Sequence, residues 1–327
     1  RAGGDIIKFA GDAFIAVWRD DRTSSHALAA RAVSCCIEML RVSDRFEAAE
    51  DTVLRLHAGV ATGEIDALLL GSAETGYEYI VVGATVERMG DAAGAAASGE
   101  CVLCARTAEL LGEALAGAET SRLGSGMLRV VPRNVPRAAP PAAADANGDD
   151  DIAAAADRHA GVHATLAHRE RLLTYIPAVS RAMYEAADAT STSDLPPLLA
   201  AEHRVASVLF LGLSGFGNGP CDVDDPAMAQ AALLTVQRAA ARHRTAVIRL
   251  VADDKGLRIL AACGLSGFAD RDDAWRCAQF AMACAKELRS MRVQCCGGLT
   301  LGRIYCGEVG SAVRGEFTLH GAHVNSA

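Results

Sequence analysis

The pattern of apolar and polar positions predicts a strand-turn-strand hairpin near the start of the chain. Apolar side chains flank a Gly-Asp pair on both sides across residues 6–18, and Asp12 stands at the turn. Gly-Asp is a favoured hairpin dipeptide, so the turn alone assigns no chemistry. Gly11 nevertheless lets the backbone approach a ligand closely, and an acidic residue anchored by a buried hairpin is suited to hold a metal.

A second apolar pattern, VASVLFLGL at 205–213, has the length of a strand and predicts a central strand covered on both faces. Before it, residues 132–160 are rich in Pro, Ala and Asp and lack apolar periodicity over most of their length. This composition predicts a linker. We therefore expect a first domain at 1–131, a linker with a helical segment at 132–200 and a second domain at 201–327.

The two sides of the linker repeat each other. Glycines recur at the same spacing, with Gly59, Gly63 and Gly71 against Gly298, Gly302 and Gly310. Positions further along also match, with Glu78, Tyr79 and Gly83 against Glu316, Phe317 and Gly321. In each half a hairpin pattern precedes an amphipathic helix, at 24–46 and at 272–288. Two copies of one domain predict a pseudo-symmetric pair with a site at their shared face.

Composition narrows the classes of function. The chain has 51% hydrophobic and 22% charged residues and a net charge of −8, which is typical of a globular protein and gives no basic footprint for nucleic acid. No apolar run reaches the roughly 20 residues of a membrane helix, and the first residues do not have the layout of a signal peptide, so we expect a cytoplasmic protein without a membrane span.

The 11 cysteines lie in helix and strand patterns and are expected to be reduced and buried. Cys101 and Cys104 lack the further ligands of a zinc site.

Five stretches carry a resemblance to a known family: GGDIIKFAGDAFIAVW, HAGVATGEI, YIVVGATVE, DDKG and GEFTLHGAHVN. The sequence resembles class III nucleotidyl cyclases, most closely those of the soluble adenylyl cyclase type, which have two tandem catalytic domains. The resemblance covers 1–131 and 201–327 and leaves out the linker. It implies an α/β fold of the α+β sandwich type, with the two cyclase domains forming a pseudo-symmetric intramolecular dimer. It also implies that the first strand of one domain and the end of the other are missing here.

The resemblance assigns roles to single residues. Asp12 matches one of two aspartates that hold two Mg²⁺ or Mn²⁺ ions, while the other aspartate belongs on a strand before Arg1. Lys255 and Thr318 match the positions that read adenine, with the lysine as donor and the hydroxyl as acceptor. Asn325 matches the asparagine that positions the ribose. Its usual partner, an arginine four residues later, falls beyond the end of the chain.

The second half resembles a degenerate copy, because Gly212 stands where a metal aspartate is expected. Only one of the two pseudo-symmetric sites is then catalytic, and the other resembles a pocket that binds bicarbonate. Lys8, Val81 and Arg88 are the candidate residues of that pocket. The arginine of the family pattern is absent, because residues 90–91 are Gly and Asp, which weakens the expected anion site unless Arg88 replaces it.

The expected activity is conversion of ATP to 3′,5′-cyclic AMP and pyrophosphate by two-metal catalysis at the interface of the two domains. The partners implied are ATP and, as a candidate regulator, bicarbonate. The alternatives are a guanylate cyclase and a non-catalytic cyclase-homology module. A diguanylate cyclase is disfavoured, because GGDIIKF lacks the glutamate of a GGDEF signature. We expect this chain alone to be inactive, because both sides of its active site are cut.

Overall fold

The computed structural model describes residues 3–11, 13–44, 47–49, 52–53, 55–115, 118–131, 173–176, 180–181, 201–253, 255–310 and 315–327. Contacts divide the chain into two compact units. Unit 1 takes its described residues from Arg1–Ile6, Ala16–Ile65 and Ala84–Ala167. Unit 2 takes its described residues from Ile7–Ile15, Asp66–Gly83 and His168–Ala327. Two segments of the first half of the sequence therefore belong to the same unit as the second half.

Unit 2 is built on a five-stranded antiparallel sheet in the order β12-β13-β11-β14-β15. Its strands are β11 (Glu202–Ser214), β12 (Ala246–Asp253), β13 (Gly256–Cys263), β14 (Gln294–Gly310) and β15 (Gly315–His320). The predicted central strand is confirmed, because β11 lies in the middle of the order and pairs with β13 and β14. The core contains Val208, Ile248 and Leu260, all at most 2% exposed.

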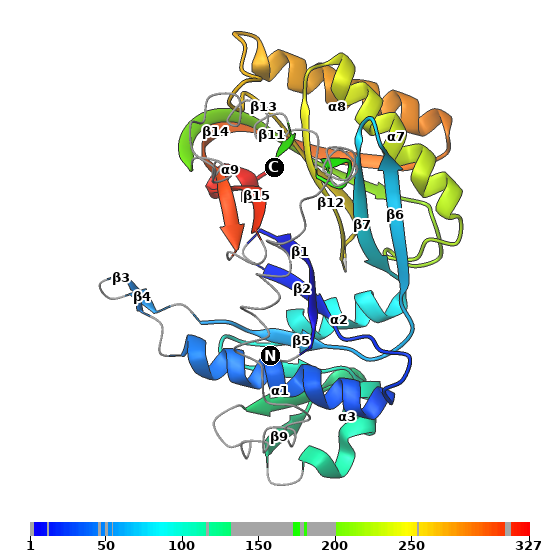
Figure 1. Ribbon diagram of the computed structural model, residues 1–327, viewed down its shortest axis with the longest axis vertical. Coiled ribbons are helices and arrows are strands. Elements are labelled where there is room, and N and C mark those ends of the chain that lie inside the picture. The colour runs from blue at the N-terminus through cyan, green and yellow to red at the C-terminus, as the bar shows by residue number, and fades with distance from the viewer. Residues whose placement is uncertain are drawn as a thin grey trace, which may run out of the picture. The chain divides into compact units, whose positions relative to one another are not determined.

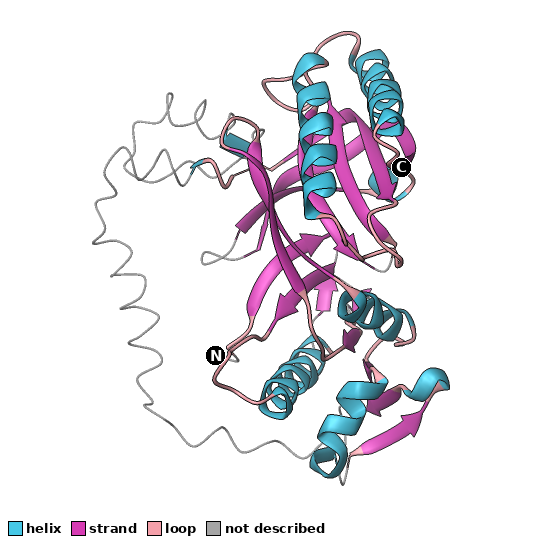
Figure 2. Cartoon of the chain, turned by 90° about the vertical axis from the view of Figure 1, so that its right-hand side faces the viewer, coloured by secondary structure: helices cyan, strands magenta, loops and turns pink. Residues whose placement is uncertain are grey.

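Among its described residues, unit 2 has the helices α7 (Pro226–Arg242), α8 (Asp273–Ser290) and α9 (Ala322–Asn325). Asp225 caps α7 by accepting hydrogen bonds from the N–H groups of Ala227 and Met228. The buried residues of α8 are spaced three or four apart, as an amphipathic helix requires: Cys277, Phe280, Cys284 and Leu288. Helices α7 and α8 contact each other and lie over the sheet, as Figures 1 and 2 show.

Two hairpins from the first half of the sequence complete unit 2. The first is β6 (Asp66–Ser72) with β7 (Gly76–Val82), which packs on α7 and β12. Gln230 of α7 makes two hydrogen bonds of 2.7 Å to the backbone of Gly71, one as donor and one as acceptor. The second is the tip, Ile7–Ile15, of the paired strands β1 (Asp5–Ala10) and β2 (Ala13–Val17). The hairpin predicted at 6–18 is thus confirmed.

Unit 1 contains a four-stranded sheet in the order β5-β8-β10-β9, in which β5 and β8 run parallel. Its strands are β5 (Ala58–Val60), β8 (Cys101–Leu103), β9 (Glu119–Arg122) and β10 (Leu128–Val131), and a separate pair is formed by β3 (Glu47–Ala49) and β4 (Thr52–Val53). Its helices are α1 (Ser25–Ser43), α2 (Ala84–Gly94) and α3 (Ala105–Leu111), followed by short 3₁₀ turns at Gly112–Leu115 and Gly124–Gly126. Ser24 caps α1, whose buried face shares a core with β5, β8 and β10.

The predicted repeat is visible in the order of elements and in the backbone. Each half has a hairpin followed by a long helix, β1-β2-α1 and β12-β13-α8. The matched glycines Gly83 and Gly321 both have positive φ, 109° and 136°, and each directly precedes a helix. One difference is that β14 is continuous, whereas the matching region of the first half is divided into β5 and β6. The mixed α/β fold is therefore confirmed, and the pairing of the halves as a pseudo-symmetric dimer stays a prediction.

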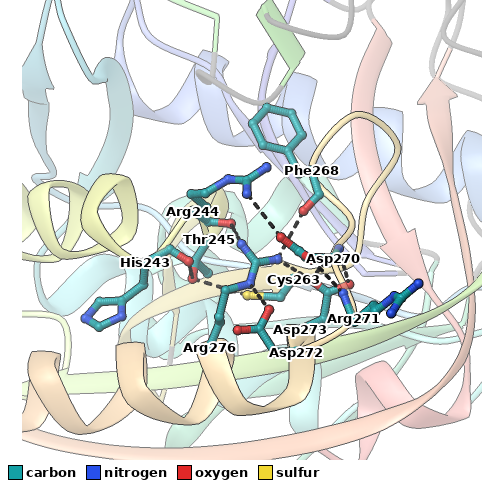
Figure 3. A network of polar contacts seen from close by, with 10 residues as sticks. All are labelled: His243, Arg244, Thr245, Cys263, Phe268, Asp270, Arg271, Asp272, Asp273 and Arg276. Carbon is teal, nitrogen blue, oxygen red and sulfur yellow. Dashed lines mark hydrogen bonds and ion pairs between the residues drawn. The ribbon is translucent and has the colours of Figure 1, made fainter.

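A polar network fixes the start of α8 (Figure 3). Arg276 is paired with Asp273, lies 3.2 Å from a carboxylate oxygen of Asp272, and donates to the carbonyl of Phe268 at 3.2 Å. Each of these contacts lies within a few residues of the helix start or on the loop before it. The network therefore has a structural explanation, since it stabilises the connection from β13 to α8.

All 11 cysteines are free thiols, as expected, and eight of them are buried. Cys101 lies in β8 and Cys104 directly precedes α3, so the strand composition of the CVLC stretch corresponds to a strand in the structure. Over the part of the chain that the structure describes, no helix is long and apolar enough to cross a membrane.

Candidate active site

The hairpin β1-β2 carries the predicted metal residue. Asp12 itself lies outside the described residues, while Gly11 before it has a φ of 69°, a conformation that glycine adopts without strain. Within the described ranges, no group of three or more His, Cys, Asp or Glu side chains is placed to hold a metal ion. The metal pair is thus a prediction that rests on the resemblance.

Lys8 on β1 was predicted to bind an external anion, but in the structure it has an acidic side chain as its partner. Its ammonium forms an ion pair with Glu78 of β7, and the two side chains are only 12% and 4% exposed. Lys8 and Val81 line one small pocket together with residues of β2 and β12, so two of the three predicted anion-pocket residues do come together. Glu78, the ion-pair partner of Lys8, is not one of the predicted anion-pocket residues, although its match to Glu316 in the repeat marked the position.

Arg88, the third predicted pocket residue, belongs to unit 1 and is exposed on α2. Its guanidinium donates to the carbonyl of Ala84 at 3.0 Å and to the hydroxyl of Thr85 at 3.4 Å, both on the first turn of its own helix. In this conformation the group is engaged locally.

A second buried ion pair lies beside the same strand. Arg249 of β12 is 2% exposed, and its Nη1 atom lies 3.7 Å from Oε1 of Glu316 on β15. Burial lowers the pKa of Arg249, while the nearby carboxylates of Glu316 and Glu78 act in the opposite direction. Arg249 also donates a hydrogen bond to the carbonyl of Phe9, and Glu316 accepts one from the Phe9 N–H at 3.3 Å. Two ion pairs, Lys8 with Glu78 and Arg249 with Glu316, therefore involve or contact strand β1.

The residues predicted to read the nucleotide all lie in unit 2. Thr318 on β15 is completely buried, and its hydroxyl has no hydrogen-bond partner among the described residues. Lys255 is exposed at the turn between β12 and β13, where its N–H donates to Asp253 at 3.0 Å. Asn325 is exposed at the end of α9. In the described part of the chain no hydrogen bond joins these three side chains.

The position that the resemblance interprets as degenerate has an arginine as its neighbour on the next strand. Gly212 on β11 lies opposite Arg258 on β13 in the sheet register. The guanidinium of Arg258 is paired with Asp253 and lies 5.9 Å from the centroid of the Phe210 ring. The interpretation of Gly212 as part of a copy that holds no metal stays a prediction.

The fold is mixed α/β, with an antiparallel sheet covered by helices in unit 2 and a partly parallel sheet in unit 1. No protein-family model matches the chain. Curated adenylate cyclase type 10 proteins match over 85 residues, at 35% identity for Mus musculus and Homo sapiens. The match covers 26% of this chain, and the chain spans about 5% of the length of those relatives. The resemblance to class III cyclases is therefore confirmed.

The solved structures that match this chain are less similar to it in sequence than the curated relatives are. The adenylyl cyclase CyaB from P. aeruginosa is 17% identical with a TM-score of 0.34, covering 38% of this chain and 70% of that chain. A bacterial light-regulated adenylyl cyclase is 15% identical with a TM-score of 0.40, covering 55% of this chain and 51% of that one. The guanylate cyclase domain of RhGC from Catenaria anguillulae, in complex with GTP, is 19% identical with a TM-score of 0.33. That match covers 38% of this chain and 71% of that chain.

Proposed function

We propose that the protein containing this chain is a cytoplasmic class III adenylate cyclase that converts ATP to 3′,5′-cyclic AMP and pyrophosphate. The observation that carries the proposal is Thr318, a fully buried hydroxyl without a partner among the described residues, at the position where the resemblance expects an adenine-reading group. An unsatisfied buried polar group is destabilising, so its presence requires an explanation. A hydrogen bond from the exocyclic amine of adenine to this hydroxyl would supply the missing partner.

Each remaining residue has a role in this proposal. The ammonium of Lys255 donates to a ring nitrogen of adenine, and the amide of Asn325 holds the ribose. The 3′-hydroxyl gives its proton to solvent and its oxygen attacks the α-phosphorus in line. A new P–O bond forms, and the bond from the α-phosphorus to the pyrophosphate oxygen breaks. Two Mg²⁺ or Mn²⁺ ions near Asp12 would bind the phosphates and lower the pKa of that hydroxyl.

The test uses the full-length protein, because the other metal aspartate is expected before Arg1. Asp12→Ala is expected to lower cyclic AMP formation from Mn²⁺·ATP by about 1,000-fold or more. Asp21→Ala, which changes an exposed aspartate nearby, serves as the matched control and should leave the rate unchanged. Near-normal activity of Asp12→Ala contradicts the proposal. We also propose that the 327-residue chain alone forms little or no cyclic AMP, and robust turnover by it would overturn that statement.

The choice of nucleotide separates this proposal from its alternatives. Thr318→Val removes the acceptor for the adenine amine and should raise KM for ATP by about tenfold. A guanylate cyclase would instead turn over GTP in preference to ATP before any substitution. A non-catalytic module would bind nucleotide without forming a cyclic product even when full length.

We further propose that bicarbonate has at most a weak effect on this protein. Lys8 is already neutralised by the buried carboxylate of Glu78, so an external anion would have to displace a resident one. Glu78→Gln removes that competitor and should make the melting temperature or the cyclase rate responsive to bicarbonate. A strong bicarbonate response of the unmodified protein would contradict this.

A further inference from the structure

Both polar groups of the Phe9 backbone are bound by charged side chains from distant parts of the sequence. The N–H donates to Oε2 of Glu316 at 3.3 Å, and the carbonyl accepts from Nη1 of Arg249. These partners lie 307 and 240 residues away along the chain. Because Arg249 and Glu316 are also ion-paired with each other at 3.7 Å, the three groups form a closed ring of contacts. We call this ring the Phe9 clamp.

The two charged side chains of the Phe9 clamp are largely buried, which is uncommon for charged groups. Arg249 is 2% exposed and Glu316 is 15% exposed, so both charges have lost most of their hydration. The Nε and Nη2 atoms of Arg249 have no hydrogen-bond partner among the described residues. The carbonyl of Phe9 and the carboxylate of Glu316 are therefore the contacts that compensate this buried cation, and moving Phe9 away would leave it poorly satisfied.

Phe9 lies on β1 close to the turn that leads to β2. It lies one residue before the end of the strand at Ala10, and three residues before Asp12. A strand advances by roughly 3.3 Å per residue, so a fixed Phe9 restrains the backbone within about 10 Å of the turn. The preceding residue, Lys8, is held through its side chain by Glu78. Two consecutive residues of β1 are thus fixed, one by its side chain and one by its main chain.

We propose that Arg249 and Glu316 are positioning residues, which fix the main chain of Phe9 and through it the β1-β2 turn of the catalytic site. The inference rests on the proposed cyclase function and extends it, since it assigns to the second half of the sequence a role in orienting a turn of the first half. Neither residue contacts substrate in this assignment. Its effect is on the geometry of the turn and hence on the chemical step.

The first measurement is independent of activity. Hydrogen exchange in a peptide covering residues 5–11 should show protection at the Phe9 amide in the unmodified protein. Arg249→Met and Glu316→Ala should each remove that protection. Unchanged protection in both variants, with the proteins folded, overturns the clamp.

The second measurement separates positioning from plain stabilisation. Glu316→Ala should lower kcat by about tenfold or more while KM for ATP changes by less than about twofold, because the Glu316 carboxylate contacts Arg249 and the Phe9 N–H and is not one of the proposed nucleotide-binding groups. Glu316→Gln keeps an oxygen acceptor for the Phe9 N–H and should recover most of kcat and the amide protection. If Gln behaves like Ala in both readouts, only the charge matters and the positioning role is wrong.

A matched control is available on β11, where Arg204 and Glu202 form an ion pair at 2.7 Å in the same unit. Glu202→Ala should leave kcat and the exchange of residues 5–11 unchanged, and all assays are run below the melting temperature of each variant. The two proposals fail differently. If Asp12→Ala abolishes turnover while Glu316→Ala leaves kcat unchanged, the inference fails and the cyclase function stands. If Asp12→Ala is fully active, the proposed function fails first, and exchange at Phe9 then reports only on structure.

Discussion

Glu78 and Glu316 occupy matching positions in the two halves of the repeat, yet they neutralise different kinds of cation. Glu78 on β7 pairs with a lysine ammonium on β1, whereas Glu316 on β15 pairs with an arginine guanidinium on β12 and also accepts a backbone N–H. The lysine forms one ion pair, and the arginine adds a hydrogen bond to a strand backbone. The comparison teaches that a duplicated fold can retain a carboxylate at one position while each copy uses it differently.

The largest expected effect on stability comes from replacing Arg249 and Lys8, the cations of these two ion pairs, one at a time. Arg249→Met leaves Glu316 and the Phe9 carbonyl without their partner and should lower the free energy of unfolding by about 3–5 kcal/mol. Lys8→Met should cost less, about 2 kcal/mol, because Arg249 still acts electrostatically on Glu78. Urea denaturation measures both. An equal or larger loss for Lys8→Met would reverse the ranking of the two pairs.

The matched glycines test the repeat at the level of the backbone. Gly83→Ala and Gly321→Ala both place a Cβ atom at a positive φ, and neither new atom meets a neighbour closer than 3.6 Å. Conformational strain alone should therefore lower stability by about 1–3 kcal/mol in each case. The check is thermal unfolding of both variants side by side. A neutral result at one position would show that the two halves differ there.

Buried thiols should make the second half sensitive to alkaline pH. Burial raises the pKa of Cys284 to about 12 and that of Cys306 to about 11. Below pH 9 the thiols are neutral in both the folded and the unfolded chain. Above pH 9 the unfolded thiols ionise first, so stability falls by up to about 1.4 kcal/mol per thiol per pH unit until the folded pKa is reached.

In the first half, the contact between Cys36 and Cys101 lowers one pKa and raises the other, so their effects partly offset. Denaturation series at pH 8 and pH 10 should therefore show a smaller pH dependence for a Cys284→Ala, Cys306→Ala double variant than for Cys36→Ala, Cys101→Ala. The same dependence in both variants would remove this difference between the halves.

The smallest expected effect compares two fully buried threonines. Thr107 donates to the hydroxyl of Thr62 at 2.9 Å, whereas Thr318 has no partner among the described residues. Thr318→Val should raise the free energy of unfolding by about 0.5–1 kcal/mol, and Thr107→Val should lower it by about 1 kcal/mol. Calorimetry of the two variants without nucleotide measures this. A destabilising Thr318→Val would show that the hydroxyl is satisfied in the free protein.

Much of the fold followed from local patterns. The hairpin at 6–18, the strand at 205–213 and the helices after each hairpin are present close to the predicted bounds, because alternation and helical spacing depend only on nearby residues. The repeat was also readable, since glycines with special backbone angles recur at fixed spacing. Asp12 lies outside the described residues, so its metal role remains a prediction.

The partners of the candidate site could not be predicted in the same way. No sequence pattern singled out Arg249, and Arg88 was considered as the missing cation because it is near in sequence. In the structure Arg88 is engaged on its own helix, and Arg249 is the second buried cation beside β1. A contact across 240 residues depends on strand register and on sheet packing, which no local pattern contains.

The sequence alone therefore determined the class of fold, the internal repeat and the resemblance to class III cyclases, since these depend on the order and spacing of residue types. Only the tertiary structure decided which charges meet. It placed Glu78 on Lys8 and the pair of Arg249 and Glu316 on the backbone of Phe9, because a charge that is buried by folding must find its counter-charge among whatever side chains the packed strands bring near.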